Sequence, residues 1–230
     1  DLEEVGKARR TGTRVTFLPD EGIFAERSVS WDTLSNRLRE MAFLNRGLRI
    51  LLTDERQERQ EEFFYTGGIR QFVELLNENK TTLHPRPIHI EAQRDDTYIE
   101  VALQYNDSYA ETVFSFANNI NTQDGGSHVI GFRSALTRTV NAYASGRNLL
   151  KDLKVSLSGD DVREGLTAVI SVRLPSPQFE GQTKGRLNNP DVKGLVEAFV
   201  NEKLGEYFEE NPGIGRRIVE KASDAARARD

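Results

Sequence analysis

The stretch IHIEAQRDDTYIEVALQYNDSYAETVFSFA, residues 88–117, contains three strand-like runs in close succession. The runs are Ile88–Ala92, Tyr98–Tyr105 and Thr112–Ala117. Ile99, Val101, Leu103 and Tyr105 recur with the two-residue period of a strand that buries one face. Short polar turns rich in aspartate and asparagine separate the runs, which suits an antiparallel meander. We therefore expect these three strands to lie side by side in one sheet.

Upstream of this stretch, the sequence predicts both strands and helices. Residues 13–18 alternate between apolar and polar side chains, which is typical of a strand. Ser30 can cap a helix whose apolar residues recur at helical spacing as far as Met41. The runs Leu48–Thr53 and Glu61–Tyr65 flank a charged segment, so they predict a hairpin with a solvated tip.

Downstream, the sequence predicts a long helix, a strand and two further helices. Ser127 follows two glycines and can cap the first of these helices, and the alternating run Leu166–Leu174 predicts the strand. The last two helices begin at Asn189-Pro190 and Asn211-Pro212, where asparagine suits the cap and proline suits the first helical position. This order of elements is that of a mixed α+β protein.

A domain boundary is predicted where Gly67-Gly68 interrupts the chain. The boundary separates residues 1–67, which end with the predicted hairpin, from residues 68–230. A short helix with a stripe of apolar side chains opens the second part. No internal repeat or low-complexity segment is visible in either part.

Composition limits the classes of function that this chain can serve. It has 230 residues, a net charge of -5 and no cysteine, which excludes disulfides, thiolate metal sites and a cysteine nucleophile. No apolar run reaches the roughly 18 residues of a membrane-spanning helix, so we expect no contact with a membrane. The acidic balance argues against a protein that coats nucleic acid, so contact with nucleic acid requires a local patch.

Familiar catalytic motifs do not occur in the sequence. It contains no GxxxxGK[ST] phosphate loop, no GxGxxG motif and no GxSxG nucleophile elbow. The three histidines, His84, His89 and His128, are widely spaced, so the sequence predicts no clustered histidine metal site.

One acidic group fits two interpretations. Asp160, Asp161 and Glu164 follow Ser158-Gly159, and acidic residues at this place are typical of the start of a short helix. The same carboxylates also suit acid–base catalysis or Mg²⁺ binding. The sequence favours the helix start and leaves the second interpretation open.

The segment Pro177–Lys184, with the sequence PQFEGQTK, follows a predicted strand and is bounded by proline and glycine, so we expect an exposed loop. Lys184 can reach an anion as a point charge. The amide of Gln182 can donate to a phosphate oxygen or orient a water molecule. Composition alone is also consistent with an ordinary solvated loop.

A resemblance favours the anion-binding interpretation. PQFEGQTK resembles the QTK loop in the B subunits of type IIA DNA topoisomerases, above all those of bacterial gyrase. Long stretches in the same order are also similar to that family, among them RTGTRVTFLPD (residues 10–20), YTGGIRQFVELLN (residues 65–77) and FANNINTQDGGSHVIGFRSALTRTVNAY (residues 116–143). The resemblance covers almost the whole chain, and the corresponding B chain of topoisomerase IV is a close relative within the same family.

The resemblance implies a fold and a function. Residues 1–67 would be the C-terminal part of a GHKL-type ATPase α/β sandwich, and residues 68–230 a ribosomal-protein-like transducer domain that ends in long helices. The parent protein would couple the binding and hydrolysis of ATP to closure of a DNA gate and to strand passage, which alters DNA supercoiling. A non-enzymatic nucleic-acid-binding module and another GHKL ATPase are the alternatives.

The resemblance also implies roles for particular residues. Lys184 would contact the γ-phosphate of ATP, with Gln182 assisting at the same group and Thr183 between them in the nucleotide-binding loop. Thr13 matches a threonine near the adenine-binding and aminocoumarin-binding end of the pocket, although strand packing would equally explain it. Arg133 matches an arginine that couples hydrolysis to the DNA gate, and Arg138 on the same helix would line the DNA cavity. Surface ion pairs are the alternative role for both arginines.

Further expectations concern ligands, partners and location. ATP and Mg²⁺ would act in the parent protein, and no metal ligand is expected in this chain. The partners would be a DNA duplex, the gyrase A protein in an A2B2 heterotetramer, a second copy of the gyrase B protein on ATP binding and aminocoumarin inhibitors. The location would be the bacterial cytoplasm, at the nucleoid.

The family places its catalytic glutamate and glycine-rich lid before residue 1 and its cleavage motif after residue 230. We therefore expect this chain alone neither to hydrolyse ATP nor to cleave DNA.

Overall fold

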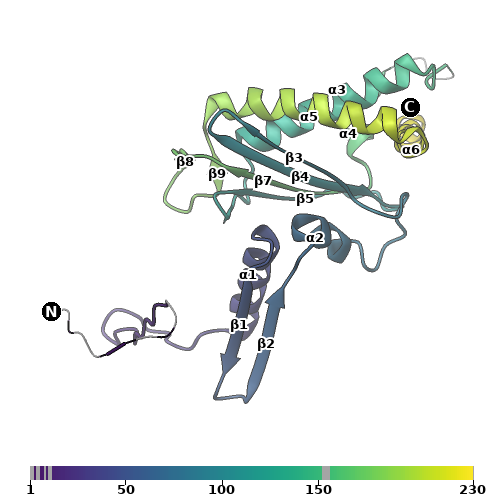
Figure 1. Cartoon of the computed structure of the whole chain (residues 1–230). Helices are drawn as coiled ribbons and strands as arrows, with labels where there is room; N and C mark the ends of the chain where they lie inside the picture. Colours follow the sequence, from purple (N-terminus) through teal and green to yellow (C-terminus); the bar gives the residue numbers. More distant parts are fainter. Residues whose placement is uncertain (1–2, 4–5, 8, 10–11, 152–155, 230) are drawn as a thin grey trace.

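The computed structural model describes residues 3, 6–7, 9, 12–151 and 156–229 (Figure 1). Residues 10–11 of the first family-like stretch thus lie outside the described residues. The helices are α1 (Trp31–Leu44), α2 (Gly68–Leu76), α3 (Ser127–Gly146), α4 (Gly159–Arg163), α5 (Pro190–Glu210) and α6 (Pro212–Arg229). The strands are β1 (Arg49–Asp54), β2 (Arg59–Phe64), β3 (Ile88–Arg94), β4 (Thr97–Tyr105), β5 (Thr112–Ala117), β6 (Ile120–Asn121), β7 (Leu166–Arg173), β8 (Phe179–Glu180) and β9 (Arg186–Leu187). None of the described helices combines the length and apolar character needed to cross a membrane.

The central sheet has the strand order β3-β4-β7-β5-β6. Strands β3, β4 and β7 pair antiparallel, whereas β5 runs parallel to β7. The expected meander of β3, β4 and β5 is therefore wrong in its last step, because β7 lies between β4 and β5. Seven of the eight residues of β7 are buried, as a central strand requires. Turn residues could not reveal this insertion, because β7 follows β5 by about fifty residues.

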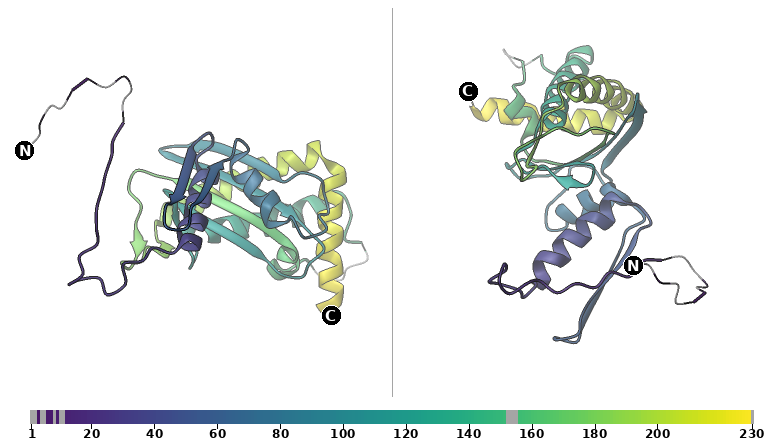
Figure 2. Two further views of the ribbon diagram at one scale, coloured as in Figure 1. Left: turned by 90° about the horizontal axis from the view of Figure 1, so that it is seen from below. Right: turned by 90° about the vertical axis from the view of Figure 1, so that its left-hand side faces the viewer.

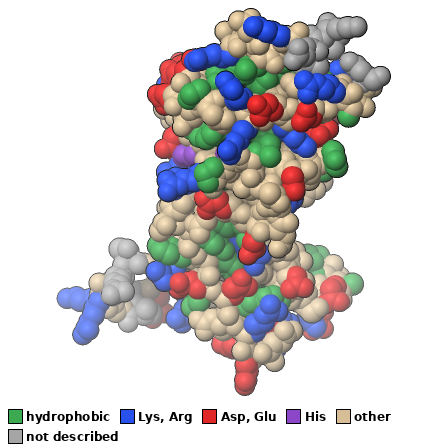
Figure 3. Space-filling view, turned by 90° about the vertical axis from the view of Figure 1, so that its right-hand side faces the viewer, with side chains coloured by type: hydrophobic (Ala, Val, Ile, Leu, Met, Phe, Trp, Pro, Cys, Tyr) green, Lys and Arg blue, Asp and Glu red, His purple; other side chains and the backbone are tan. Residues whose placement is uncertain are grey.

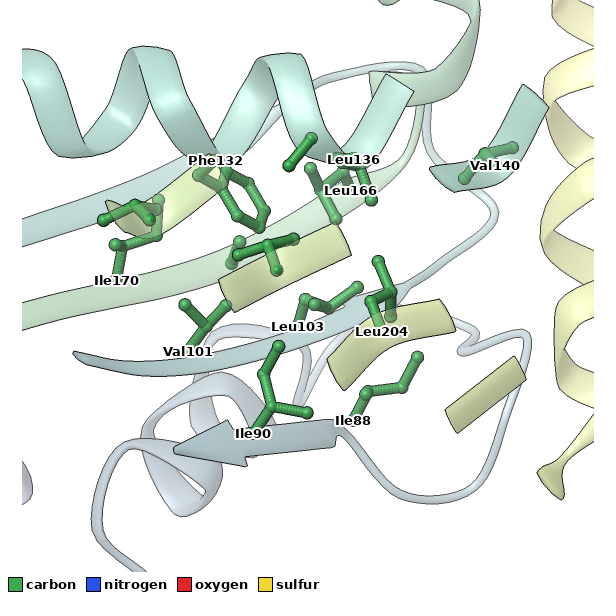
Figure 4. Packing of buried hydrophobic residues seen from close by; sticks show 14 of the residues in the cluster. Ile88, Ile90, Val101, Leu103, Phe132, Leu136, Val140, Leu166, Ile170 and Leu204 are labelled. Atoms are coloured by element: carbon green, nitrogen blue, oxygen red, sulfur yellow. The ribbon is translucent and has the colours of Figure 1, made fainter. Parts of the chain in front are cut away.

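Helices cover both faces of this sheet (Figures 1 and 2). On one face, α3 and α5 pack over apolar side chains of β3, β4 and β7, of which Figure 4 shows a part. The two helices approach closely at Gly131, where a Cβ atom would lie 2.4 Å from the carbonyl oxygen of Lys193. This close approach fixes α3 and α5 relative to each other.

The opposite face of the sheet carries α1 and α2. Phe43 of α1 stacks on Phe72 of α2 with ring centroids 4.7 Å apart, and both belong to a buried cluster that includes Ala102 and Phe116 of the sheet. The β1–β2 hairpin projects away from the sheet beside α1 (Figure 1). Residues 1–67 and 68–230 therefore share a hydrophobic cluster across the Gly67-Gly68 junction.

Several local predictions are confirmed. The backbone N–H of Thr33 donates to the Oγ of Ser30 at 3.3 Å, so Ser30 caps α1. The charged segment forms the tip of an antiparallel hairpin, in which Leu51 pairs with Glu62. The last two helices begin at Pro190 and Pro212.

Two local predictions are wrong. Residues 13–18 form no strand, and Phe17 and Leu18 are exposed, because no described residue supplies the ladder of hydrogen bonds that a strand needs. Ser127 does not cap α3. The cap is Gly126, and the buried Oγ of Ser127 has no hydrogen-bond partner among the described residues. The close approach of Leu187 to Gly126, described below, explains why a glycine takes the cap position.

Candidate functional site

The loop that carries Gln182, Thr183 and Lys184 is the turn of a small hairpin. Strands β8 and β9 form its base through the pairs Phe179↔Leu187 and Glu180↔Arg186. The turn is tight, because Lys184 adopts a left-handed φ of 56° and its N–H donates to the carbonyl oxygen of Gly181 at 3.4 Å. The side chains of all three predicted nucleotide-binding residues are exposed.

The ammonium group of Lys184 points to no carboxylate in the part of the chain that the structure describes. Its Nζ lies 6.0 Å from the ring centroid of Phe179, at the outer limit of a cation–π contact. The charges on the two strands pair with each other, since Nε of Arg186 lies 3.4 Å from a carboxylate oxygen of Glu180. The carboxylate of Asp124 lies beside Gly185, where a Cβ atom would stand 2.4 Å from its Oδ2. The turn thus presents the Lys184 ammonium to an anionic group, with the Asp124 carboxylate at the base of the turn.

The hairpin docks against the start of α3 through backbone groups. The N–H of Asp124 donates to the carbonyl oxygen of Gly185 at 2.9 Å, and the N–H of Leu187 donates to that of Gly125 at 3.1 Å. Gly126 has a φ of 136°, and a Cβ atom there would lie 2.3 Å from the carbonyl oxygen of Leu187. A glycine is therefore required for β9 to approach this turn.

A second attachment joins the hairpin to the start of α5. The N–H of Gln178 donates to Oδ1 of Asn189 at 2.7 Å, and Nδ2 of Asn189 donates to the carbonyl oxygen of Ser176 at 3.1 Å. The N–H of Asn188 also donates to the carbonyl oxygen of Gln178 at 2.8 Å. Sequence reasoning assigned Asn189 only a capping role and missed this contact, because an Asn-Pro pair signals a helix start whatever its side chain binds.

Arg133, predicted to couple hydrolysis to the DNA gate, and Arg138, predicted to line the DNA cavity, both lie on α3 and are ion-paired. Nε and Nη2 of Arg133 each donate to a carboxylate oxygen of Glu111 at 2.9 Å. Nη2 of Arg138 lies 2.5 Å from a carboxylate oxygen of Glu197 on α5. These contacts match the alternative role of surface ion pairs, although both side chains retain an exposed surface.

Thr13 is not brought into the hairpin by any described contact. It lies in the exposed segment before α1, which extends away from the central sheet (Figure 1). The structure thus gathers Gln182, Thr183 and Lys184 in one loop, places Arg133 and Arg138 along the adjoining helix, and leaves Thr13 apart from both groups.

The carboxylates near α4 have local structural partners. Oγ of Ser158 accepts from the N–H of Asp161 at 3.2 Å, and Oδ2 of Asp161 accepts from the N–H of Ser158 at 2.7 Å, which completes a capping box. Asp160 contacts Arg163 at 2.6 Å, and Glu164 contacts Lys221 at 3.1 Å. These contacts support the helix-start interpretation of the acidic group.

The fold does assemble one histidine–carboxylate group that sequence reasoning missed. Ligand atoms of His89, Glu91 and Glu100 lie within 4.8 Å of one another. Nη2 of Arg46 sits among them, 2.6 Å from Glu91 and 2.7 Å from Glu100, so a guanidinium already supplies the positive charge. Burial acts to raise the pKa of Glu100, but hydrogen bonds from His89 and Arg46 outweigh it and hold that pKa below its usual value. The signal in the sequence was the spacing of His89 and Glu91, which puts both on one strand face.

The charges on the molecular surface are interspersed. Figure 3 shows lysine, arginine, aspartate and glutamate side chains mixed over one face, with no broad area of a single sign. This mixture agrees with the overall net charge of -5. A polyanion could therefore contact only a few lysine or arginine side chains at a time on that face.

Comparison with known proteins reveals relatives along the whole chain. A family model described as DNA gyrase B matches residues 68–230. The chain is 51% identical over 230 residues to the DNA gyrase B protein of Clostridium acetobutylicum, a match that covers 100% of this chain and 36% of that relative. The chain thus spans little more than a third of the length of this curated relative.

Solved structures share the architecture. The 43K ATPase domain of Thermus thermophilus gyrase B, solved with an aminocoumarin, superposes with a TM-score of 0.82 at 38% identity, over 92% of this chain and 57% of that chain. The topoisomerase IV ATP-binding domain of Francisella tularensis, solved with a small-molecule inhibitor, gives a TM-score of 0.77 at 27% identity over the same two shares. The mixed α/β fold described above is therefore the fold of these ATPase-region structures.

Proposed function

This chain belongs to the DNA gyrase B family, and we propose that it forms part of the ATP-hydrolysing component of a type II DNA topoisomerase. In the parent protein, the binding and hydrolysis of ATP would drive closure of a DNA gate and strand passage. The observation that carries this proposal is the exposed Gln182–Lys184 turn, whose hairpin is attached to the starts of α3 and α5.

The hairpin would work as a sensor of the terminal phosphate. The Lys184 ammonium would attract that phosphate as a point charge, and the Gln182 amide would donate to one of its oxygens. These contacts exist only while the terminal phosphate is attached to the nucleotide. Hydrolysis removes the partner of Lys184, so the hairpin loses a contact that distinguishes the two nucleotide states, as a switch requires.

The residues near the turn fit a phosphate better than a metal ion. Lys184 and Gln182 supply positive charge and a donor, and Glu180 is already paired with Arg186. ATP bound to Mg²⁺ would therefore meet this chain through its phosphate oxygens. We assign no Mg²⁺ ligand to residues of this chain, and Thr13 remains a proposed neighbour of the adenine end.

The proposed partners follow from the family. They are a DNA duplex, the gyrase A protein in an A2B2 heterotetramer, and a second copy of the gyrase B protein that joins on ATP binding. Work on DNA would place the parent protein at the bacterial nucleoid, in the cytoplasm. Arg133 and Arg138 would leave their ion pairs with Glu111 and Glu197 and bind phosphates of the passing duplex instead. Such contacts do not depend on the DNA sequence. The aminocoumarin in the Thermus thermophilus structure supports a similar inhibitor site in the parent protein.

We further propose that residues 1–67 and 68–230 belong to different domains of the parent protein. The left-handed φ of 59° at Gly68 and the family match that begins at this residue support the boundary. The cluster around Phe43 and Phe72 lies across it, so the two parts would move as packed neighbours.

The B chain of topoisomerase IV is a second candidate for the parent protein. The superposition with the Francisella tularensis domain favours it specifically, because that structure shares the fold at a TM-score of 0.77. The sequence identities to gyrase B proteins are higher, so gyrase B remains the favoured candidate for the parent protein. A non-enzymatic module and another GHKL ATPase have no comparable support.

Replacing Lys184 by alanine in the full-length parent protein tests the proposal. We expect Lys184→Ala to lower ATP turnover by about 100-fold or more, because it removes a charge that stabilises the transferred phosphoryl group. Relaxation and cleavage of DNA that need no ATP should be retained. Lys203→Ala is the matched control, since Lys203 pairs with Glu202 and Glu206 on the outer face of α5. Wild-type ATP turnover by Lys184→Ala would refute the role of the hairpin.

A further inference from the structure

We propose that Asn189 is a positioning residue for the Gln182–Lys184 turn, an inference that rests on the proposed role of Lys184 as the phosphate contact. Asn189 would act through the base of the hairpin, without touching the nucleotide. Its side chain would fix the strand that precedes the turn to the start of α5, so that Lys184 meets the phosphate at a constant position.

The side chain of Asn189 does not cap the helix that it precedes. Asn189 occupies the N-cap position of α5, but its side chain makes no hydrogen bond to the first turn of that helix. Oδ1 accepts from the N–H of Gln178, and Nδ2 donates to the carbonyl oxygen of Ser176. The residue is only 6% exposed, so both hydrogen bonds are shielded from water.

A second Asn-Pro pair in the chain shows the contrast. Asn211 precedes Pro212 at the start of α6, and its Nδ2 donates to the carbonyl oxygen of Tyr207 in the preceding turn of α5 at 3.0 Å. That contact is local and joins neighbouring helices only. The same dipeptide therefore serves a helix junction at residue 211 and the hairpin base at residue 189.

The attachment at Asn189 complements the attachment at α3. The second strand of the hairpin is bound to the turn before α3 by the Asp124 and Leu187 backbone hydrogen bonds. The segment that leads into the first strand is held by the Asn189 side chain and by the Asn188–Gln178 backbone hydrogen bond, and α3 and α5 approach closely at Gly131. Loss of the Asn189 contacts would leave this side of the hairpin with only the Asn188–Gln178 hydrogen bond, so the position of the turn that carries Lys184 would be less constrained.

Replacing Asn189 by aspartate separates positioning from helix stability. The carboxylate can still accept from the N–H of Gln178, but it cannot donate to the carbonyl oxygen of Ser176 and would repel it. A negative charge at the start of α5 interacts favourably with the helix dipole. Asn189→Asp should therefore loosen the hairpin without weakening the helix.

The experiment measures steady-state ATP hydrolysis and Tm of the full-length parent protein. We expect kcat of Asn189→Asp to fall about 10-fold, because small displacements of a positioned group have large effects on rate. KM for ATP should change less than kcat. Loss of the buried hydrogen bond to Ser176 lowers Tm, but Tm should stay well above the assay temperature, so that the protein remains folded during the measurement. Asn211→Asp is the matched control: it also loses a donor to a backbone carbonyl oxygen and lowers Tm, but it lies away from the hairpin and should leave kcat unchanged. Asn189→Ser, whose hydroxyl can both donate and accept, should recover part of kcat.

Two results would overturn the positioning role. One is a wild-type kcat in Asn189→Asp. The other is a fall in kcat that is explained by unfolding, seen as a Tm at or below the assay temperature in both Asn189 variants. The Lys184→Ala variant, measured in parallel, separates the two proposals. If Lys184→Ala is inactive and Asn189→Asp is fully active, only the role of Asn189 is contradicted. If Lys184→Ala is fully active, the phosphate-sensing role itself fails.

Discussion

His128, at the start of α3, is a fully buried histidine whose protonation state follows from its neighbours. Its Nε2 lies 3.1 Å from Oγ1 of Thr122, and that hydroxyl donates to the carbonyl oxygen of Ser115 at 2.9 Å. With the Thr122 proton directed at Ser115, the neutral tautomer that fits donates its Nε2–H to Thr122 and leaves Nδ1 as a bare acceptor with no partner among the described residues. Protonation would bury an unpaired N–H, and burial lowers the pKa of His128 from 6.5 to about 4.

This lowered pKa predicts a loss of stability in acid. In the unfolded chain, His128 binds a proton as pH falls below 6.5. In the folded chain, it does so only as pH falls to about 4. The free energy of unfolding should therefore fall by about 1.5 kcal/mol between pH 6.5 and pH 5 from this residue alone. His128→Gln removes the titrating group and should flatten that dependence. Urea-unfolding midpoints at the two pH values provide the measurement, and equal pH dependence in both proteins would contradict the assignment.

At the residue scale, the exposure of the Gln182–Lys184 loop could be predicted from the sequence, whereas the contacts that hold the loop in place could not. Lys184 and Gln182 lie in an exposed loop, as predicted from the bounding proline and glycine. Asn189 could not be recognised, because its partners Gln178 and Ser176 lie in the connection between β7 and β8, more than ten residues away. A side-chain contact across such a distance depends on how the hairpin folds back, and no local pattern records it.

At the scale of elements, the hairpin and the turn before α3 behave as one unit. Their contact depends on Gly126, whose backbone conformation and lack of a Cβ atom let Leu187 approach. Gly194 in α5 offers the opposite case, since nothing lies within 4 Å of the place where its Cβ would stand. The two glycines therefore allow a matched comparison.

Gly126→Ala should destabilise the protein, and Gly194→Ala should not. A methyl group at residue 126 would lie 2.3 Å from a backbone oxygen, and such overpacking costs about 1–3 kcal/mol. At residue 194 alanine should stabilise the helix by about 0.5–1 kcal/mol. Thermal or urea unfolding of both variants measures these changes. A Gly126→Ala protein as stable as the wild type would mean that the hairpin does not dock as described.

The elements themselves were largely predictable, whereas their pairing was not. Ser30, the charged hairpin tip and the two Asn-Pro pairs marked their helices and turns correctly, because capping and turn chemistry are local. The meander prediction placed β5 beside β4, because short polar turns favour neighbours in sequence. In the sheet, β5 lies between β7 and β6. The strand that separates β4 from β5 is β7, which is buried on both faces and therefore takes a central position.

At the scale of the whole molecule, one ionic cluster joins the two parts of the chain. Arg46, which follows α1, bridges Glu91 and Glu100 on the sheet and also lies 3.1 Å from His89. Gly68 makes room for it, because a Cβ atom there would lie 2.7 Å from the Arg46 side chain. The glycine pair that marks the predicted boundary therefore also admits the guanidinium that links both sides. Sequence reasoning could not find this link, which connects residues about fifty positions apart.

The central claim for the molecule is that Lys184 contacts the terminal phosphate of bound nucleotide. Amine-reactive labelling of the full-length parent protein, read by mass spectrometry, tests that contact directly, with Lys203 as the internal control. A non-hydrolysable ATP analogue should protect Lys184 several-fold from labelling, since an ion pair with phosphate lowers the reactivity of the amine. ADP, which lacks the terminal phosphate, should leave Lys184 as reactive as in the free protein. Equal labelling of Lys184 in the free, ADP-bound and analogue-bound protein would contradict the account.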